Sequence, residues 1–233
     1  MIQRRGLALC LLLATCSLPA TATAQSRSLG WGDSTPGHQD LAFDCGSPPG
    51  EAVLVASFQA PYADVIGIVA QVDMCTKPFD LPEWWRFDLP GACRDGTLEL
   101  STNLAGGPAS FATAWSGPTS ESVVTTFGHT WSAAMNRFTV TIVSASGEPF
   151  PVVRGTTYYA FRLIFHTPAG KCAGCTMPAC FVINSLVVTS STGTTETEME
   201  YTNWTRWQSG QPDCPFVVAS EPATWGRVKA AYR

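Results

Sequence analysis

Cysteine is the residue type in this sequence that most clearly could do chemistry. Its densest cluster is Cys172 and Cys175 followed by Cys180. Three thiolates at this spacing could hold zinc or an iron–sulfur cluster, although the nearby Asn184 would be a poor fourth ligand. In an oxidising compartment the same thiols would form disulfides. A Cys-x-x-Cys redox centre is disfavoured, because this pair precedes a strand-like run instead of opening a helix.

The full cysteine count favours disulfides over metal. Nine cysteines are present, and Cys10 and Cys16 lie in an N-terminal segment that resembles an export signal. The disulfide candidates are the other seven: Cys45, Cys75, Cys93, Cys172, Cys175, Cys180 and Cys214. Because seven is odd, one thiol should lack an internal partner. The pairing that we favour is Cys75 with Cys93, which would close a loop and contribute about 3 kcal/mol.

Residues 1–24 predict a signal peptide. A basic head containing Arg4 and Arg5 precedes a short apolar run, and Ala22-Thr23-Ala24 is a small-x-small pattern that predicts cleavage after Ala24. The apolar run is too short for a membrane span, and no later segment has the length of one. We expect a secreted, periplasmic or cell-surface protein. The alternative is a lipoprotein acylated at Cys16.

Tryptophan supplies the main candidate for ligand binding. Eight tryptophans are present, and Trp84 and Trp85 are adjacent in an aromatic loop. Adjacent residues of a strand point to opposite faces, so one ring of this pair could be exposed and stack on a sugar. Rings of this size more often fill a core or seal its ends, and that structural role is the alternative for Trp84 and Trp85.

Other catalytic patterns are weak. The sequence contains no nucleophile elbow, no His-Glu-x-x-His and no phosphate-binding glycine loop. The histidines, which we expect at the surface or at strand ends, are His38, His129 and His166. Another set of residues is expected to share one strand face, either as a calcium site or as protection of an edge strand: Glu196, Glu198 and Glu200. We favour edge protection and predict no metal and no cofactor.

Composition narrows the class of protein. Only 14% of the residues are charged and 45% are hydrophobic, which excludes a disordered or collagen-like chain. Loss of residues 1–24 would change the formal net charge from −4 to −6, so we expect no nucleic-acid partner. The length fits one domain of about 200 residues.

The elements that position these residues are predicted to be strands. Alternating apolar residues predict half-buried strands over 137–142 and 157–166, the latter with Tyr159, Phe161, Leu163 and Phe165 facing inward. Further strand-like runs are 52–58, 65–72, 97–100, 122–127, 181–188 and 194–201. We therefore predict an all-β, antiparallel, jelly-roll-like β-sandwich over 41–233, stapled by disulfides. A flexible leader is predicted over 25–40, with Trp31 as its anchor, and a short helix from Pro222 to the C-terminus.

Several segments together resemble a group of uncharacterised secreted bacterial proteins. These segments are 81–87 (LPEWWRF), 158–163 (YYAFRL), 172–186 with its three cysteines, and 224–233 (TWGRVKAAYR). The resemblance implies a secreted all-β domain and assigns no activity and no functional residue. Members of the group carry a Trp-Asp-Asp-Cys-like element, whereas this chain reads Trp31-Gly32-Asp33-Ser34, and the missing thiol would explain the odd count.

Two functions remain open on the sequence. We expect a secreted, non-catalytic binding or surface-structural module, with a polysaccharide or another cell-envelope component as candidate partner. The alternative is an extracellular hydrolase that acts on glycans through two carboxylates about 5 to 10 Å apart. The lack of a catalytic pattern favours the module.

Overall fold

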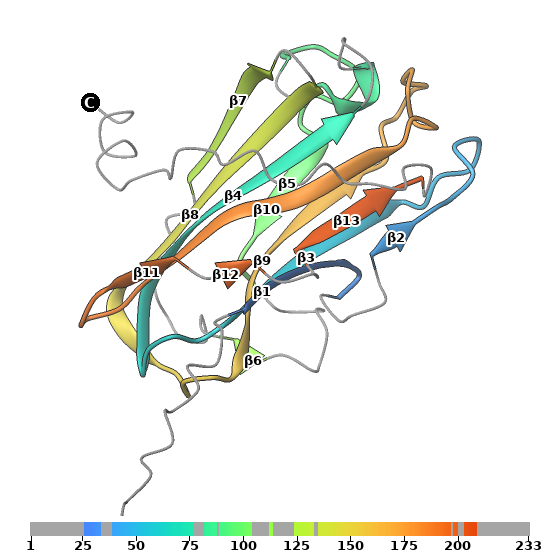
Figure 1. The fold of residues 1–233 in the computed structure, drawn as a ribbon. Helices are drawn as coiled ribbons and strands as arrows, with labels where there is room; N and C mark the ends of the chain where they lie inside the picture. Colours follow the sequence, from blue (N-terminus) through green and yellow to red (C-terminus); the bar gives the residue numbers. More distant parts are fainter. Residues whose placement is uncertain are drawn as a thin grey trace, which may run out of the picture.

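The structure is a computed structural model, and it describes residues 26–33, 39–76, 82–87, 89–103, 112–113, 124–132, 135–196, 198–199 and 203–208. Its described residues form two β-sheets that lie face to face (Figure 1). The prediction of a β-sandwich stapled by disulfides is therefore confirmed.

The first sheet has the strand order β12-β1-β3-β9-β5, and β6 also pairs with β9. Its strands are β1 (Ser26–Trp31), β3 (Glu51–Gln59), β5 (Leu98–Ser101), β6 (Ala112–Thr113), β9 (Thr157–His166) and β12 (Glu198–Met199). The long pairs β1–β3, β3–β9 and β5–β9 are antiparallel, whereas β12 and β6 pair in parallel.

The second sheet has the strand order β2-β13-β10-β4-β8-β7, and β11 also pairs with β10. Its strands are β2 (Asp40–Leu41), β4 (Asp64–Thr76), β7 (Val124–Ser132), β8 (Met135–Pro151), β10 (Ala179–Thr189), β11 (Thr194–Glu196) and β13 (Trp204–Trp207). Its short β2–β13 pair is parallel as well. The predicted antiparallel pattern thus holds for the long ladders and fails at three short edge pairs.

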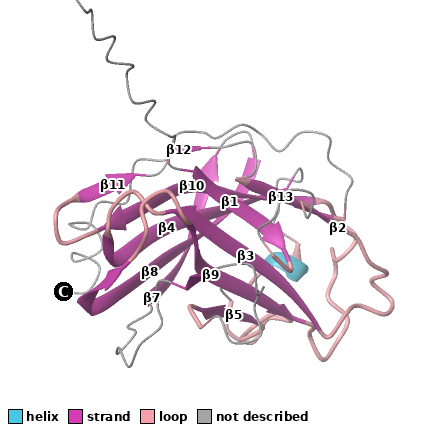
Figure 2. Cartoon of the chain, turned by 90° about the horizontal axis from the view of Figure 1, so that it is seen from below, coloured by secondary structure: helices cyan, strands magenta, loops and turns pink. Residues whose placement is uncertain are grey.

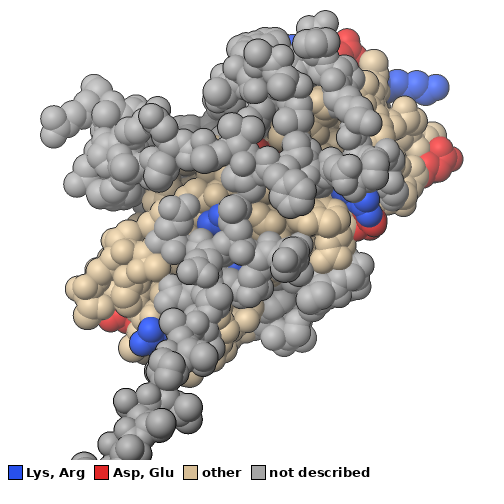
Figure 3. All heavy atoms as spheres, viewed as in Figure 1, with Lys and Arg blue, Asp and Glu red and all other residues tan. Residues whose placement is uncertain are grey.

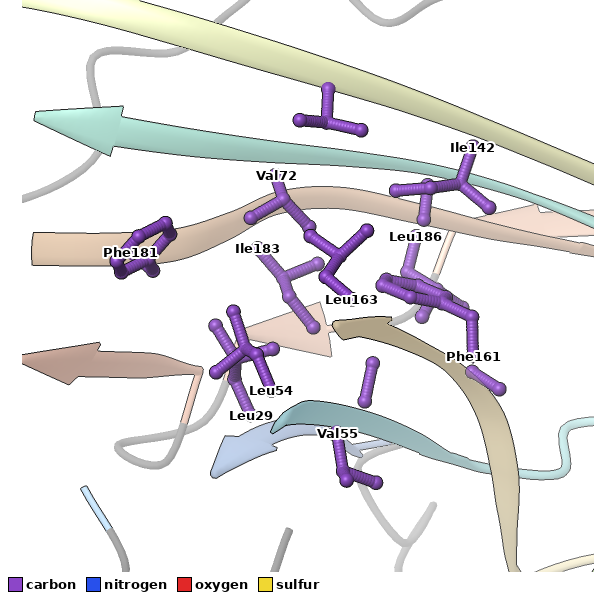
Figure 4. Close-up of a cluster of buried hydrophobic side chains, with 14 of the residues drawn as sticks. Leu29, Leu54, Val55, Val72, Ile142, Phe161, Leu163, Phe181, Ile183 and Leu186 are labelled. Atoms are coloured by element: carbon purple, nitrogen blue, oxygen red, sulfur yellow. The ribbon is translucent and has the colours of Figure 1, made fainter. Parts of the chain in front are cut away.

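The side chains between the sheets follow the predicted period of two. Strand β9 has the predicted bounds, and the four residues predicted to face inward are at most 3% exposed: Tyr159, Phe161, Leu163 and Phe165. The prediction that this strand is half-buried is wrong, because Tyr158, Ala160 and Ile164 on its other face are at most 7% exposed as well. Figure 4 shows Leu54 and Leu163 of the first sheet near Ile183 and Leu186 of the second, whereas Val55 points to the other side of β3. These contacts form one cluster of buried apolar side chains.

The predicted flexible leader is wrong for residues 26–31. This segment is strand β1 and pairs with β3 from Arg27↔Phe58 to Trp31↔Leu54. Leu29 and Trp31 are buried at every second position, which confirms Trp31 as an anchor. The serines and glycine between them hide this short period-two signal in a composition typical of linkers.

The predicted acidic strand is also interrupted. Glu196 ends β11 and Glu198 begins β12, and these two strands belong to different sheets. The two residues therefore do not share one strand face, and Glu200 lies outside the described residues. The predicted signal peptide and the predicted C-terminal helix lie outside the described residues too.

Described charged side chains are few on the face of the molecule shown in Figure 3. On the face shown in Figure 3, the described Lys, Arg, Asp and Glu residues lie scattered among uncharged ones. Among the described residues, the most exposed of the large apolar side chains is that of Val153, which is 66% exposed.

Candidate functional site

Eight aromatic rings pack together at one end of the sandwich, which we call the aromatic end. The loops that follow β2, β4 and β9 meet there, where the β4 and β9 arrows end (Figure 1). The rings belong to Trp31, Phe43, Trp84, Trp85, Phe87, Phe165, Phe181 and Trp207. Trp207 is central, since its ring centroid lies 4.7 Å from that of Phe43 and 5.0 Å from that of Trp85.

Trp84 and Trp85 are both buried. They lie in a 3₁₀ turn, η1 (Glu83–Trp85), which Figure 2 shows among the loops of this end. The Trp84 side chain is 4% exposed and that of Trp85 is 0% exposed, so the prediction of one exposed ring is wrong, and the structural role, in which such rings fill a core, is the one observed. A 3₁₀ turn separates successive side chains by about 120°, so the strand rule of opposite faces does not apply.

Two disulfides tie the loops of the aromatic end. Cys45 pairs with Cys175, and Cys93 pairs with Cys172. The cluster around Cys172 therefore joins separate loops instead of forming one metal centre. Between them these bridges link the loop after β2, the turns after η1 and the loop after β9.

The predicted pairing of Cys75 with Cys93 is wrong. Cys75 lies on β4, opposite Cys180 of β10, and is the free cysteine among those described. Cys93 lies in a turn at the aromatic end, next to Cys172. Cys180 is disulfide-bonded, and Cys214 lies outside the described residues. Spacing along the chain could not reveal this arrangement, because the loop after β9 comes close to the turns after η1 only in three dimensions.

Arg94 is the least expected residue of the aromatic end. Its side chain is 1% exposed, and its guanidinium carbon lies 4.3 Å from the centroid of the Trp84 ring and 4.8 Å from that of Phe87. Its carbonyl oxygen accepts hydrogen bonds from the backbone N–H and the hydroxyl of Thr97. The turn therefore holds Arg94 with its side chain directed into the ring cluster.

Among the described residues, the nitrogens of the Arg94 guanidinium have no hydrogen-bond acceptor. Its Nε, Nη1 and Nη2 atoms are buried without a hydrogen bond, and so are the Nε1 atoms of Trp84 and Trp85. Burial lowers the pKa of Arg94 to about 10, because the charged form loses its hydration. The other two indoles nearby have acceptors, since Trp207 donates to Cys175 and Trp31 donates to Arg206. The aromatic end thus holds buried donors in excess of acceptors.

Sequence reasoning missed Arg94 because its neighbourhood resembles an ordinary polar turn. The residues Gly91, Asp95 and Gly96 are all exposed, as the composition of such a turn suggests. Two facts could have drawn attention to it, namely that it directly follows Cys93 and that it lies ten residues after Trp84. Neither fact predicts burial of a charged side chain.

One of the histidines singled out in the sequence, His166, lies at the aromatic end, because it directly follows Phe165 and its backbone N–H donates to the carbonyl of Thr97. His166 ends β9 at the surface and pairs with Glu99 of β5 at 3.1 Å, which confirms the prediction of a strand-end histidine. His129 lies in β7, and His38 is outside the described residues.

A carboxylate that the sequence did not single out, that of Asp64, accepts hydrogen bonds from Ser191, and these hydrogen bonds lower its pKa.

In the described part of the chain, no helix combines the length and apolar character that a membrane span needs. The disulfides are compatible with an oxidising, extracellular location. Neither the protein-family models nor the curated proteins compared with this sequence give a match.

Proposed function

We propose that this protein is a secreted bacterial binding module without catalytic activity, that its ligand is a glycan of the cell envelope or its surroundings, and that the aromatic end binds it. The observation that carries the proposal is the surplus of buried N–H donors around Arg94, Trp84 and Trp85. Buried donors are normally satisfied, so a site that holds several without acceptors is suited to an acceptor-rich ligand. Glycans are rich in oxygen acceptors.

The frame around the aromatic end supports a binding role. Binding residues concentrate on loops that a rigid scaffold positions, and here the loops join two sheets and carry two disulfides. Rigid loops lose little conformational entropy when a ligand binds. The predicted signal peptide ending at Ala24 would bring the chain to a compartment where these disulfides persist, and acylation at Cys16 would instead anchor it there.

The alternative function, a glycan hydrolase, needs one carboxyl group with a raised pKa and a second nearby. The carboxylates of the aromatic end include Glu83 and Asp95, and each accepts a hydrogen bond from a backbone N–H, of Ala173 and of Gly91 respectively. Both carboxylates therefore hold the loops in place. The module is for this reason the function that we propose.

Affinity electrophoresis of the exported protein through gels that contain single polysaccharides tests the proposal. We expect at least one neutral or anionic polysaccharide to retard the wild-type protein, and Trp207→Ala to abolish the retardation. Release of reducing ends that is lost in both Glu83→Gln and Asp95→Asn would instead support the hydrolase. Absence of retardation by every polysaccharide in the panel would overturn a glycan-binding role.

A further inference from the structure

We propose that Arg94 binds the carboxylate of an acidic ligand, with a uronic acid residue of a polysaccharide as its source. This inference rests on the proposed function and specifies the class of ligand. The Arg94 side chain is 1% exposed and its guanidinium contacts two aromatic rings. The three nitrogens of this guanidinium have no acceptor among the described residues. A buried charge without a partner is unfavourable, so an anion that pairs with it would bind favourably.

The described contacts of the Arg94 guanidinium are with ring faces and not with hydrogen-bond acceptors. The rings of Trp84 and Phe87 contact the guanidinium, and ring faces stabilise the cation only in part because they accept no hydrogen bond of normal strength. The N–H groups lie in the plane of the guanidinium and form a fork. A carboxylate is planar and accepts two parallel hydrogen bonds from such a fork. The buried indole donors of Trp84 and Trp85 belong to the same ring cluster and add donors for oxygen atoms.

Charge favours a carboxylate over a phosphate group. The aromatic end presents one buried guanidinium, while Glu83 and Asp95 beside it are acidic and exposed. A carboxylate carries one negative charge, which a single guanidinium balances, whereas a phosphate monoester carries more than one charge at neutral pH and is commonly held by several cations. The site therefore fits a monoanion.

The turn that carries Arg94 lies at the surface of the molecule. Gly91 and Gly96 are exposed and have positive φ angles of 77° and 67°, and a Cβ atom at either position would meet nothing within 4 Å. Leu89, near the start of this turn, is 39% exposed. The backbone of this turn is thus exposed, whereas the guanidinium nitrogens of Arg94 are buried, so a carboxylate would have to displace part of the turn to reach them.

Binding of polygalacturonate tests the proposal without any substitution. Its fully methyl-esterified form keeps the sugar backbone and removes the charge. We expect wild-type protein to bind the acid form at least about tenfold more tightly than the ester, because a charge-assisted pair would be lost. Addition of salt should weaken binding of the acid form only. Equal affinity for the two polymers would overturn the proposal.

Variants of Arg94 then test whether this residue binds polygalacturonate. Arg94→Lys keeps the charge but not the fork, and we expect it and Arg94→Met to bind polygalacturonate at least about tenfold more weakly. The matched control is Arg154→Met, which removes an exposed arginine from the turn before β9, at the opposite end of that strand. An Arg94 variant that folds and binds the acid polymer as tightly as wild type would contradict the assignment. If neither Arg94 variant folds, the comparison of acid and ester decides.

Monomeric galacturonate and acetate separate this proposal from the proposed function. If these small acids raise the melting temperature of wild type but not of Arg94→Met, and no polysaccharide binds, the carboxylate site stands and the glycan-binding role falls. If a neutral polysaccharide binds and the Arg94 variants bind it normally, the glycan-binding role stands and the carboxylate site falls. If no acid of either size binds, the carboxylate site falls.

Discussion

The middle of the sandwich and the aromatic end solve the problem of burial in different ways. In the middle, Leu54, Leu163 and Ile183 are at most 1% exposed and contain no polar side-chain atom, while the strand ladders satisfy the backbone. At the aromatic end, indole and guanidinium groups are buried together with their N–H donors, and some of these donors have no acceptor. Burial in the middle therefore stabilises the fold without an opposing polar cost. At the aromatic end, burial of the rings stabilises the fold, whereas burial of donors without acceptors destabilises it.

This contrast gives the disulfides a specific role. Loops with unsatisfied donors and few ladder hydrogen bonds lose conformational entropy on folding without full compensation. The described bridges both lie at the aromatic end, and they span 130 and 79 residues of sequence. Covalent links there hold an arrangement of rings and charge that packing of the middle does not determine.

The largest expected effect comes from the centre of the aromatic end. Trp207→Ala removes a ring that is 1% exposed and a hydrogen bond to Cys175, so we expect the free energy of unfolding to fall by about 3 to 5 kcal/mol. Trp204→Ala on the same strand is the matched control, because Trp204 is only half-buried and stacks with Arg206. We expect the control to lose about 1 kcal/mol or less. Urea unfolding measures both losses, and similar values for the two variants would break the distinction between core and surface rings.

The next effect concerns the bridge beside Arg94. Replacing both Cys93 and Cys172 with serine should lower the free energy of unfolding by about 2 to 4 kcal/mol, because the unfolded chain regains the entropy of an open loop. Cys75→Ser removes a thiol and no bridge, and should change stability by less than about 1 kcal/mol. Equal stabilities of the two variants would mean that ring packing alone holds the aromatic end.

The two regions also differ in how well the sequence predicts them. The middle follows period-two patterns, so the bounds of β9 were predictable to the residue. The other predicted runs overlap β3, β4, β5, β7, β8, β10, β11 and β12. Strand β1 escaped because its buried residues, Leu29 and Trp31, are too few to outweigh serine and glycine. A strand pattern reports the local environment of each residue, which suffices where neighbouring strands are long and regular.

The aromatic end was not predictable in the same way. Its order depends on contacts between loops far apart in the sequence, such as the bridge from Cys93 to Cys172 and the hydrogen bond from Trp84 to Ala173. The sequence identified the loop of Trp84 and Trp85 as notable, but nothing local distinguishes a buried ring in a 3₁₀ turn from an exposed ring on a strand. Burial of Arg94 follows only from the assembled rings.

A smaller effect with the opposite sign is expected for Arg94→Met. In ligand-free protein the guanidinium is buried without an acceptor, so an apolar side chain of similar length should raise the free energy of unfolding by about 1 to 3 kcal/mol. Arg94→Lys keeps a buried charge and should not stabilise. Urea unfolding in a buffer without carboxylates measures both. A loss of several kcal/mol in Arg94→Met would mean that the guanidinium is paired within the chain in solution, and it would remove the basis of the carboxylate site.

The smallest effect on stability, and the sharpest contrast with the bridged cysteines, is expected for Cys75. Burial raises the pKa of its thiol to about 11 from an ordinary 9.0, so at pH 8 the thiolate should be about 100-fold less populated in the folded than in the unfolded protein. Iodoacetamide should alkylate Cys75 correspondingly slowly until denaturant is added. Because the folded state binds this proton more tightly, the contribution of Cys75 to stability should decrease as the pH rises from 9 towards 11, and Cys75→Ala should remove that decrease. An alkylation rate of the folded protein within about tenfold of the rate of the unfolded protein would contradict this prediction. It would show that reagents reach the Cys75 thiol on β4 in the folded protein.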